Sequence, residues 1–454
     1  MTGAKIRKRR ENTKTMLPPA AVNICGRRLL ETLMDGNTQQ TATSGGRYAF
    51  LVLFLVLMSA LGSFVNDMFT PSLPAMCRFF HTTIPTVQLG LTAGMVGLAL
   101  GQFILGPVSD HVGRKPVLVV SVSLFIVAAV VSVFSPTINF FICCRLFQGI
   151  GASGGYFLAR TMPADLYSGR ALARLMALIG AINGIAPASA PVLGGITSDA
   201  FGWKGVFVVL AGFALIILLL SPFVRESLPE ERRTQVSVWK SFGGYRDLLR
   251  NRRFMIHVSF KGLALGVLFA YISAAPFILQ NHYGLSQTSY GLVIGFNSLF
   301  VVSGAMLSLR FHPLKKAAYT GSIILAVGIV AQAVSLWLVH SIYVYEACMC
   351  VMLFGLGLIF STTNSLAMNE GRVRAGEASS ILGISGYVVG AVVAPLVGVG
   401  NVLHSTAIVF LCLGAAVMIF SLASRRLSPD LDAPSAPPSP ASSTSESPAP
   451  PAEK

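Results

Sequence analysis

The chain has 454 residues and a net charge of +16, with 53% hydrophobic and only 11% charged residues. A water-soluble protein carries about 25% charged residues, so this composition cannot cover a soluble surface. It excludes a soluble enzyme, a nucleic-acid-binding protein and a secreted disulfide scaffold. The seven cysteines show neither metal-ligand nor redox spacing, so we expect no metal site and no bound cofactor.

Twelve apolar segments are predicted to cross a bilayer as helices, since each is close to or above the ~20 residues that a crossing requires. Some contain Gly and Pro, which membrane helices tolerate because neighbouring helices satisfy the freed backbone groups. The predicted fold class is therefore an all-α polytopic membrane protein. In chain order, the segments lie at residues 48–74, 86–107, 116–134, 138–160, 172–197, 204–224, 254–279, 288–309, 318–339, 342–365, 378–399 and 402–423.

The placement of Lys and Arg predicts the orientation of these helices, because the cytoplasmic loops of membrane proteins carry an excess of both. If the N-terminus is cytoplasmic, 29 of the 34 lie in cytoplasmic segments, and only Arg78 and Lys204 lie on the opposite side. The remaining three, Arg145, Arg160 and Lys261, fall within predicted helices. We therefore place both termini in the cytoplasm, and the basic charge requires no nucleic-acid partner.

The longest loop between helices, residues 225–253, is rich in charge and divides six predicted helices from six. We predict two pseudo-symmetric six-helix halves, at residues 48–224 and 254–423. A basic tail at residues 1–47 is expected near anionic lipid headgroups. A second tail at residues 424–454 consists mainly of Pro, Ser and Ala, which build no core, and both tails are expected to be disordered.

The connection between the second and third helices reads GPVSDHVGRKP over residues 106–116. Its glycines permit tight backbone geometry, and its carboxylate can pair with arginines or helix N-termini. The string resembles the signature loop of the major facilitator superfamily, Gly-x-x-x-Asp-Arg-x-Gly-Arg-Lys/Arg, with His111 in place of an Arg, which makes one contact pH-sensitive. The alternative is a basic turn that only sets orientation. The predicted cytoplasmic gate residues are Gly106, Asp110, Gly113, Arg114 and Lys115.

The fourth predicted helix contains Arg-Leu-Phe-Gln-Gly at residues 145–149. An arginine inside the bilayer is costly, so Arg145 is expected to face a wet cavity or a counter-charge. The alternative is that its side chain extends to the outer headgroups. The string resembles the Arg-x-x-Gln-Gly motif of the same superfamily, which implies a role for Arg145 in proton coupling.

Of the 18 acidic residues, only Asp67 and Glu346 fall within predicted helices. Glu346 lies at an outer helix start, where we expect it to be solvated. Asp67 lies at about the depth of Arg145, roughly 10 Å below the outer end at 1.5 Å per residue. We predict a switch in which ionised Asp67 pairs with Arg145 and protonated Asp67 releases it. The alternative is a helix-end Asp in a Pro-rich turn.

The segment from Asp67 to Pro74 resembles the Asp-x-x-x-Pro-x-x-Pro string of drug:proton antiporters, particularly the Bcr/CflA subfamily. The fifth predicted helix is rich in Pro and Gly, which bend a helix and allow close packing. It resembles the antiporter motif of the superfamily, with Ala190 in place of a Gly, although a purely packing role is the alternative. The residues of this antiporter-like motif are Gly184, Pro187, Pro191, Gly194 and Gly195.

The resemblance implies that the first and fourth helices of each half line a substrate cavity. Aromatic residues there suit flat, amphipathic or cationic compounds. Lys261 either selects anions in this cavity or, as we favour, extends to the nearby cytoplasmic headgroups. The candidate cavity residues, beside the proton-coupling pair Asp67 and Arg145, are Asn66, Phe69, Gln148, Tyr156, Tyr271 and Asn364.

Together these motifs predict a proton-coupled transporter in the bacterial inner membrane, which exports drugs by drug:H+ antiport through alternating access. We expect a monomer, driven by the proton-motive force without a cofactor, that carries an amphipathic or cationic drug. A proton-coupled importer or exporter of a metabolite, such as a nucleoside or an amino acid, is the alternative. A remote one is an intramembrane serine protease, since residues 151–155 read Gly-Ala-Ser-Gly-Gly.

Overall fold

The computed structural model describes residues 45–233, 243–311, 313–371 and 375–427. The predicted disorder of the two tails therefore concerns residues that lie almost wholly outside the described ranges. The chain divides at Leu53 into two units. The described part of the first unit is helical, and the contacts below are those within the second unit, from Phe54 onward.

The first half contains α-helices and short 3-10 turns, without a strand among the described residues. The long α7 is interrupted at Gly202, whose φ of 69° lies in the left-handed region, and so provides two crossings. In chain order, the elements are α2 (Gly45–Asp67), η1 (Thr70–Ser72), α3 (Leu73–Phe79), α4 (Ile84–Val112), α5 (Arg114–Val133), α6 (Ile138–Leu166), α7 (Gly169–Leu220) and η2 (Ser221–Phe223).

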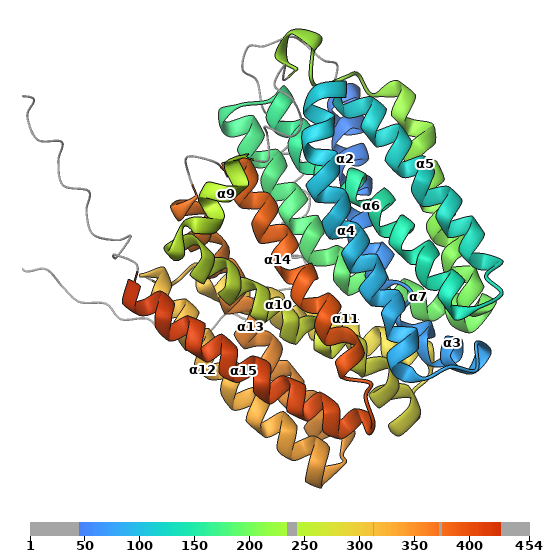
Figure 1. Cartoon of the computed structure of the whole chain (residues 1–454), viewed down its shortest axis with the longest axis vertical. Helices are drawn as coiled ribbons and strands as arrows, with labels where there is room; N and C mark the ends of the chain where they lie inside the picture. The colour runs from blue at the N-terminus through green and yellow to red at the C-terminus, as the bar shows by residue number, and fades with distance from the viewer. Residues whose placement is uncertain (1–44, 234–242, 312, 372–374, 428–454) are drawn as a thin grey trace, which may run out of the picture. The chain divides into compact units, whose positions relative to one another are not determined.

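The second half repeats this organisation after the long connection between the halves (Figure 1). The connection contains η3 (Glu230–Arg232) and α9 (Gly243–Arg250). The second half consists of α10 (Arg252–Pro276), η4 (Phe277–His282), α11 (Gln287–Ser308), α12 (Leu314–Val334), η5 (Ser335–Val339), α13 (Ile342–Glu370), α14 (Ala375–Leu396) and α15 (Val402–Leu427).

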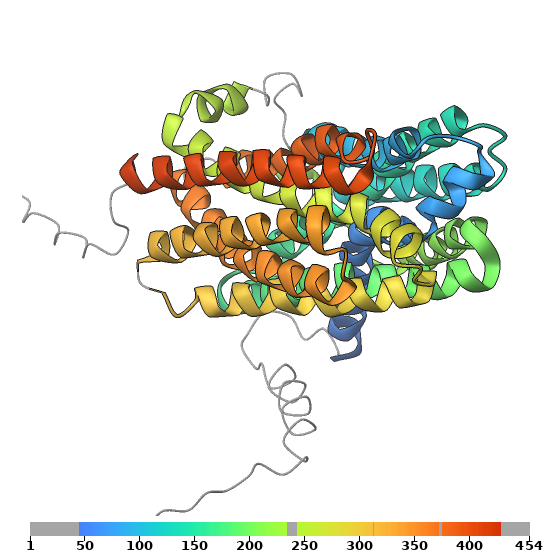
Figure 2. The same ribbon diagram turned by 90° about the horizontal axis from the view of Figure 1, so that it is seen from below.

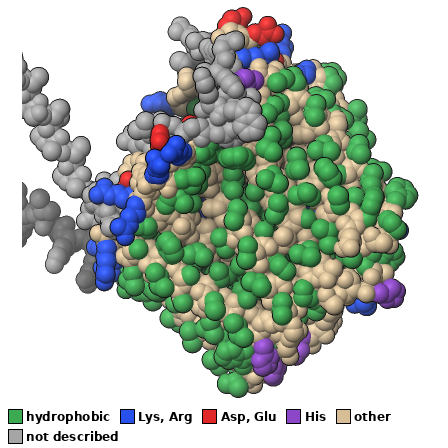
Figure 3. Space-filling model, in the orientation of Figure 1, with side chains coloured by type: hydrophobic (Ala, Val, Ile, Leu, Met, Phe, Trp, Pro, Cys, Tyr) green, Lys and Arg blue, Asp and Glu red, His purple; other side chains and the backbone are tan. Residues whose placement is uncertain are grey.

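Among the described residues, ten helical runs are long and apolar enough to cross a membrane. The remaining two predicted crossings correspond to α6 and the first part of α7, which are helical as well. Large apolar side chains cover the face that Figure 3 shows, while Lys and Arg gather towards one border. The prediction of an all-α polytopic membrane protein with two six-helix halves is confirmed.

The two halves use equivalent helix pairs, which is the basis of their pseudo-symmetry (Figure 1 and Figure 2). In the first half, the second crossing α4 packs on the fourth, α6, and in the second half α11 packs on α13. Between the halves, α4 packs on α14 and α7 packs on α11. Each half therefore contributes its second and fifth crossings to the interface.

Glycines allow the second and fourth crossings of each half to approach closely. A Cβ on Gly97 would lie 2.2 Å from a backbone oxygen of α6, and one on Gly149 would lie 2.3 Å from a backbone oxygen of α4. Gly304 and Gly357 have the same relation, with backbone oxygens at 2.1 Å in both cases. Small residues are thus required at these crossings, as is usual where membrane helices pack closely.

Two helix boundaries differ from the prediction. The first segment, expected to run to residue 74, breaks after Asp67, because Pro71 and Pro74 begin the short helices η1 and α3. The connection at 106–116 is not an extended turn: α4 continues through Pro107 to Val112, and a single residue, Gly113 with φ 107°, separates it from α5.

The bundle has two ends, which we name by residues they contain. The Arg114 end contains Arg114, Glu226 and α9, and the Pro71 end contains Pro71, Asp199 and Gln280. Side-chain hydrogen bonds join the halves at the Pro71 end and towards the middle of the bundle. These bonds include Gln88 to Ser273, Thr92 to Ala391, Gln280 to Pro71, Thr288 to Asp199 and Tyr290 to Thr70.

Candidate functional site

A cavity of about 210 Å³ lies between the halves beside Asp67. Its polar lining comes from both halves, with Asp67 and Thr70 from the first and Tyr271, Tyr290 and Ser298 from the second. The remaining lining residues are apolar: Pro187, Pro191, Leu268, Ile272, Ile294, Val301, Val302, Leu353 and Phe360. A mostly apolar cavity with a few polar groups is the usual form of a small-molecule site.

Asp67 is the last residue of α2, where the prolines that follow end the helix. The Thr70 hydroxyl donates a hydrogen bond of 2.8 Å to the backbone carbonyl of Asp67, which closes this turn. The residue is 8% exposed, and its carboxylate lines the cavity. Among the described residues, no side chain forms an ion pair or a hydrogen bond with this carboxylate.

Arg145 is fully buried on α6, and its guanidinium is held by neutral acceptors. Its Nη2 donates to the backbone oxygen of Val65 at 2.7 Å and to Asn66 Oδ1 at 3.4 Å. Nη1 donates to Gln148 Oε1 at 2.5 Å, and Nε donates to the Gly90 carbonyl at 3.3 Å. Dispersing the charge over several dipoles reduces the cost of burying it.

Aromatic rings complete the surroundings of Arg145. Its guanidinium carbon lies 4.1 Å from the centroid of the Phe69 ring and 5.9 Å from that of Phe207, within the range of cation–π attraction. Gln148 is fixed in turn, since its Nε2 donates to Ser132 Oγ at 3.1 Å. Phe69 and Gln148, predicted to contact substrate, therefore surround Arg145 instead.

The predicted pairing of Asp67 with Arg145 is not present in this structure. The two residues do lie at one depth, because Arg145 contacts Val65 and Asn66 directly. However, successive residues of a helix point about 100° apart. Asn66 faces Arg145, whereas Asp67 faces the cavity. No ion pair joins Asp67 and Arg145 among the residues that the structure describes.

The predicted gate residues meet at the Arg114 end. Arg114 forms ion pairs with Asp110 at 2.6 Å and with Asp165 of α6 at 2.9 Å, and it donates to Ser109 Oγ at 2.5 Å. His111, which replaces the Arg of the resembling loop, has its Nδ1 2.9 Å from the Pro107 carbonyl oxygen. Gly106 and Lys115 lie in α4 and α5 on either side of the break at Gly113.

Glu226, which no motif of the sequence marks, closes this cluster. Its carboxylate accepts hydrogen bonds from the backbone N–H groups of Arg114 at 2.9 Å and Lys115 at 3.0 Å, at the start of α5. Desolvation raises the pKa of the Glu226 carboxyl, but bonds from four backbone N–H groups outweigh it and hold the pKa below its usual range. A carboxylate is favourable at a helix N-terminus.

The antiporter-like motif lies in the first part of α7, where its prolines and last two glycines fit α7 against both halves. Pro187 and Pro191 line the Asp67 cavity. A Cβ on Gly194 would lie 1.8 Å from the Met68 carbonyl oxygen, and one on Gly195 would lie 2.3 Å from that of Gln287. Gly184 lies in the same helix.

The predicted cavity residues therefore separate into three places. Tyr271 lines the Asp67 cavity. Asn66, Phe69 and Gln148 hold Arg145. Tyr156 and Asn364 contact two other cations, Arg160 and Lys261. The Lys261 Nζ donates to Asn364 Oδ1 at 2.8 Å, which favours the cavity alternative over extension to the headgroups.

The expectation that Glu346 is solvated is wrong. Asn297 Nδ2 donates to Glu346 Oε2 at 2.7 Å and to the Tyr271 hydroxyl at 2.8 Å. Glu346 Oε1 is buried and has no hydrogen-bond partner among the residues that the structure describes. The sequence analysis did not single out Asn297, although a polar residue inside a predicted crossing was the available signal. It also missed Tyr290 and Thr70 of the cavity, which lie in predicted crossings as well.

The family model described as Major Facilitator Superfamily matches residues 52–395. The chain belongs to the major facilitator superfamily. It is thus a multi-pass membrane transporter for small molecules, and not an enzyme. This excludes the serine protease alternative, and the Ser153 hydroxyl donates to the backbone carbonyl of Ile150 at 2.7 Å.

Known members of the major facilitator superfamily resemble the chain over most of its length. It is 33% identical over 365 residues to the uncharacterized MFS-type transporter YdgK of Bacillus subtilis, covering 77% of this chain and 89% of the relative. It is 27% identical over 342 residues to the multidrug resistance protein MdtL of Escherichia fergusonii, covering 75% and 85%. The xylose transporter XylE of E. coli, in a partially occluded inward-open conformation, matches with a TM-score of 0.66 at 14% identity, covering 84% and 98%.

Proposed function

We propose that this major facilitator transporter exports drugs in exchange for protons, and that Asp67 is the group that binds the proton. The observation that carries the proposal is the position of Asp67, whose carboxylate lines the cavity between the halves without a counter-charge among the described residues. An unpaired buried charge is costly, so a closed cavity favours the protonated carboxyl. Opening to water favours its release.

Two further observations support export. The antiporter-like prolines Pro187 and Pro191 line the same cavity, so a bend in α7 acts directly on the site. The relative from Escherichia fergusonii is named a multidrug resistance protein. The segment from Asp67 to Pro74 resembles that of Bcr/CflA antiporters, and we assign the chain to this subfamily on these grounds.

The proposed mechanism is alternating access, in which the two halves rock about the central cavity. Substrate and proton use alternate halves of the cycle: protonation of Asp67 after substrate release favours the return to the other conformation, and reopening to the other side releases the proton. The membrane potential contributes about 2.3 kcal/mol per charge per 100 mV. In this cycle Arg145 holds the ends of α2, α4 and α6 together, as a positioning residue beside the proton site.

The proposed location is a bacterial inner membrane with the Arg114 end in the cytoplasm. The distribution of Lys and Arg along the sequence supports this orientation, since most of them lie in the segments of that end. The Arg114 cluster holds α4, α5 and α6 together within the first half. We expect it to dock against the second half when the Arg114 end closes.

The test uses proteoliposomes of the full chain with an imposed pH gradient, and Asp67→Asn as the variant. We expect Asp67→Asn to lose gradient-driven transport of a fluorescent drug while still binding it, because the amide cannot take up a proton. Asp67→Glu is the matched control and retains driven transport. Full driven transport by Asp67→Asn would refute the proposal.

The second candidate, a proton-coupled metabolite transporter, shares this site and differs in direction and cargo. It would accumulate a nucleoside or an amino acid in whole cells and leave drug accumulation unchanged. Cells that carry the gene should instead accumulate less drug than cells without it, and a protonophore should abolish the difference.

A further inference from the structure

Two cations inside the bundle have no role in the proton site. Arg160 lies on α6 of the first half, and Lys261 lies on α10 of the second. Arg160 Nη2 donates to the Tyr156 hydroxyl at 2.5 Å, and its guanidinium carbon lies 4.3 Å from the centroid of that ring. Lys261 Nζ donates to Asn364 Oδ1 of α13 at 2.8 Å.

The two cations act on each other. Arg160 of α6 lies near enough to Lys261 of α10 for its charge to act on the amine, across the boundary between the halves. Neither forms an ion pair with an acidic side chain in the described part of the chain, and the nearby Asp165 is engaged with Arg114. Two like charges near each other repel, and an anion bound between them would remove this repulsion.

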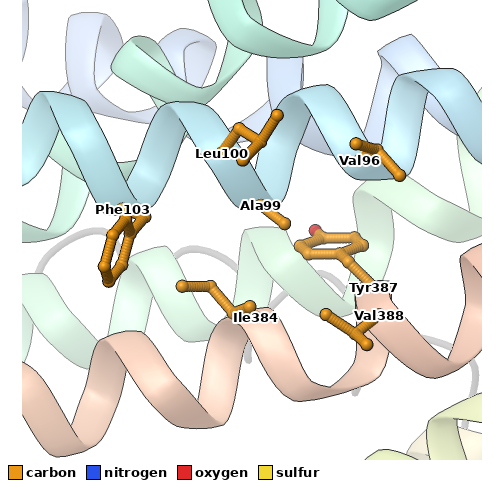
Figure 4. Close-up of a pocket in the computed structure, with 7 residues that line it drawn as sticks. All are labelled: Val96, Ala99, Leu100, Phe103, Ile384, Tyr387 and Val388. Atoms are coloured by element: carbon orange, nitrogen blue, oxygen red, sulfur yellow. The ribbon is translucent and has the colours of Figure 1, made fainter. Parts of the chain in front are cut away.

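A flat aromatic wall adjoins these cations. Tyr387 of α14 is hydrogen-bonded to Tyr156, and its ring centroid lies 5.9 Å from that of Phe269. Figure 4 shows Tyr387 extending from α14 towards α4, where it lines an apolar cavity of about 200 Å³ with Ala99 and Leu100. Charged donors and apolar aromatic surface therefore occur side by side.

We propose that Arg160, Lys261 and Asn364 form a binding subsite for the anionic group, a carboxylate or sulfonate, of an amphipathic aromatic substrate. The guanidinium and the amine would share the anion, the Asn364 amide would donate to it, and the rings of Tyr156 and Tyr387 would support the aromatic part. This inference rests on the proposed function, since it names the substrate class. It replaces the predicted preference for cationic drugs.

The subsite also suits alternating access, because its two cations belong to different halves. A shared anion would hold α6 and α10 together and would favour the conformation in which they are close. A ligand shifts a conformational equilibrium only by its difference in affinity for the two states. The subsite would distinguish ligands by their charge.

The experiment compares two dyes on one xanthene scaffold, the anion carboxyfluorescein and the cation rhodamine 6G. Binding to the purified full chain is measured by fluorescence anisotropy in a non-ionic sugar detergent, which excludes lipid phosphate as a competitor. We expect Lys261→Met and Arg160→Gln each to weaken carboxyfluorescein binding about tenfold or more, since a hydrogen bond to a charged group is lost. Lys261→Arg should retain binding.

Rhodamine 6G provides the folding control, because its binding should be unchanged or tighter in Lys261→Met. Carboxyfluorescein binding with the wild-type Kd in both Lys261→Met and Arg160→Gln would overturn the subsite. Stronger wild-type binding of rhodamine 6G than of carboxyfluorescein would overturn it as well.

The outcome is separable from that of the proposed function. If wild-type proteoliposomes show no proton-driven transport but carboxyfluorescein binding depends on Lys261, the export proposal fails and the subsite stands. If Asp67→Asn abolishes driven transport while both Lys261→Met and Arg160→Gln bind carboxyfluorescein with the wild-type Kd, the subsite fails and the export proposal stands.

Discussion

Arg145 and Glu346 occupy corresponding places in the two halves, but the hydrogen bonds of the two charged side chains differ greatly. Each charge lies on the fourth crossing of its half, α6 or α13, and is bonded to an asparagine of a neighbouring crossing. Arg145 makes four hydrogen bonds and stacks on Phe69. Glu346 accepts one bond from Asn297, and its other oxygen is buried without a partner in the described ranges of the chain.

This difference indicates that Arg145 positions helices, whereas Glu346 can change its protonation state. The Arg145 guanidinium donates four hydrogen bonds to fixed acceptors and so holds α2, α4 and α6 together. A carboxylate with a vacant oxygen has room for a proton, and Asn297 connects it to Tyr271 of the Asp67 cavity. In the first half, Arg145 therefore holds the helices together. In the second half, Glu346 is an acid that can still take up a proton.

The largest effect is expected when the Arg145 network is removed. Arg145→Ala leaves several buried acceptors unpaired, and we expect a loss of stability of at least about 3 kcal/mol, with loss of transport. Arg145→Lys should recover part of the stability, since one ammonium cannot replace the fork of a guanidinium. Thermal unfolding in detergent measures both. An Arg145→Ala protein as stable as the wild type would show that the Arg145 hydrogen bonds do not stabilise the fold.

A smaller loss of stability is expected at Gly94, beneath the same network. A Cβ at this position would lie 2.8 Å from both Arg145 Nη2 and Asn66 Oδ1. Gly94→Ala should therefore destabilise the protein by about 1–3 kcal/mol through overpacking. Gly212→Ala, in a helix with nothing within 4 Å of the added atom, is the matched control and should be neutral. Equal unfolding temperatures for the two variants would contradict the expected rigidity.

The Glu346 network is predicted to affect transport more than folding. Glu346→Gln keeps an acceptor for Asn297, so the fold should be retained. Without the titratable acid, we expect proton-driven transport to fall by about fivefold, with a flatter dependence on pH. The measurement is the initial rate of driven transport across a range of pH in proteoliposomes. Wild-type rates at every pH would place Glu346 with Arg145, as a structural charge.

Glu226 is a carboxylate that already accepts several backbone hydrogen bonds. The smallest effect on stability is expected when it is replaced. Because its folded pKa is depressed, its contribution to stability is present above the unfolded pKa and is lost as pH falls through the folded value. Glu226→Gln should lower the unfolding temperature slightly at neutral pH, and the difference from the wild type should vanish in acid. A difference that grows in acid would reverse the assigned sign.

Much of the architecture can be predicted from single segments of the chain. Apolar length predicts the crossings, because a bilayer imposes a minimum helix length on any sequence. The loop at 225–253 marks the division into halves, and the motif around Arg114 predicts a cluster that does form. The scarcity of acids in the predicted crossings is enough to mark Asp67 as exceptional.

The sequence by itself determined the fold, the common depth of Asp67 and Arg145 and the family resemblance, since these depend on composition and on spacing along one helix. Only the tertiary structure decided which charges meet. Asp67 and Asn66 are neighbours in sequence, yet their side chains leave the helix about 100° apart, so one faces the cavity and the other faces Arg145. The rotation of each helix is set by packing against its neighbours, and no spacing within a single helix specifies it.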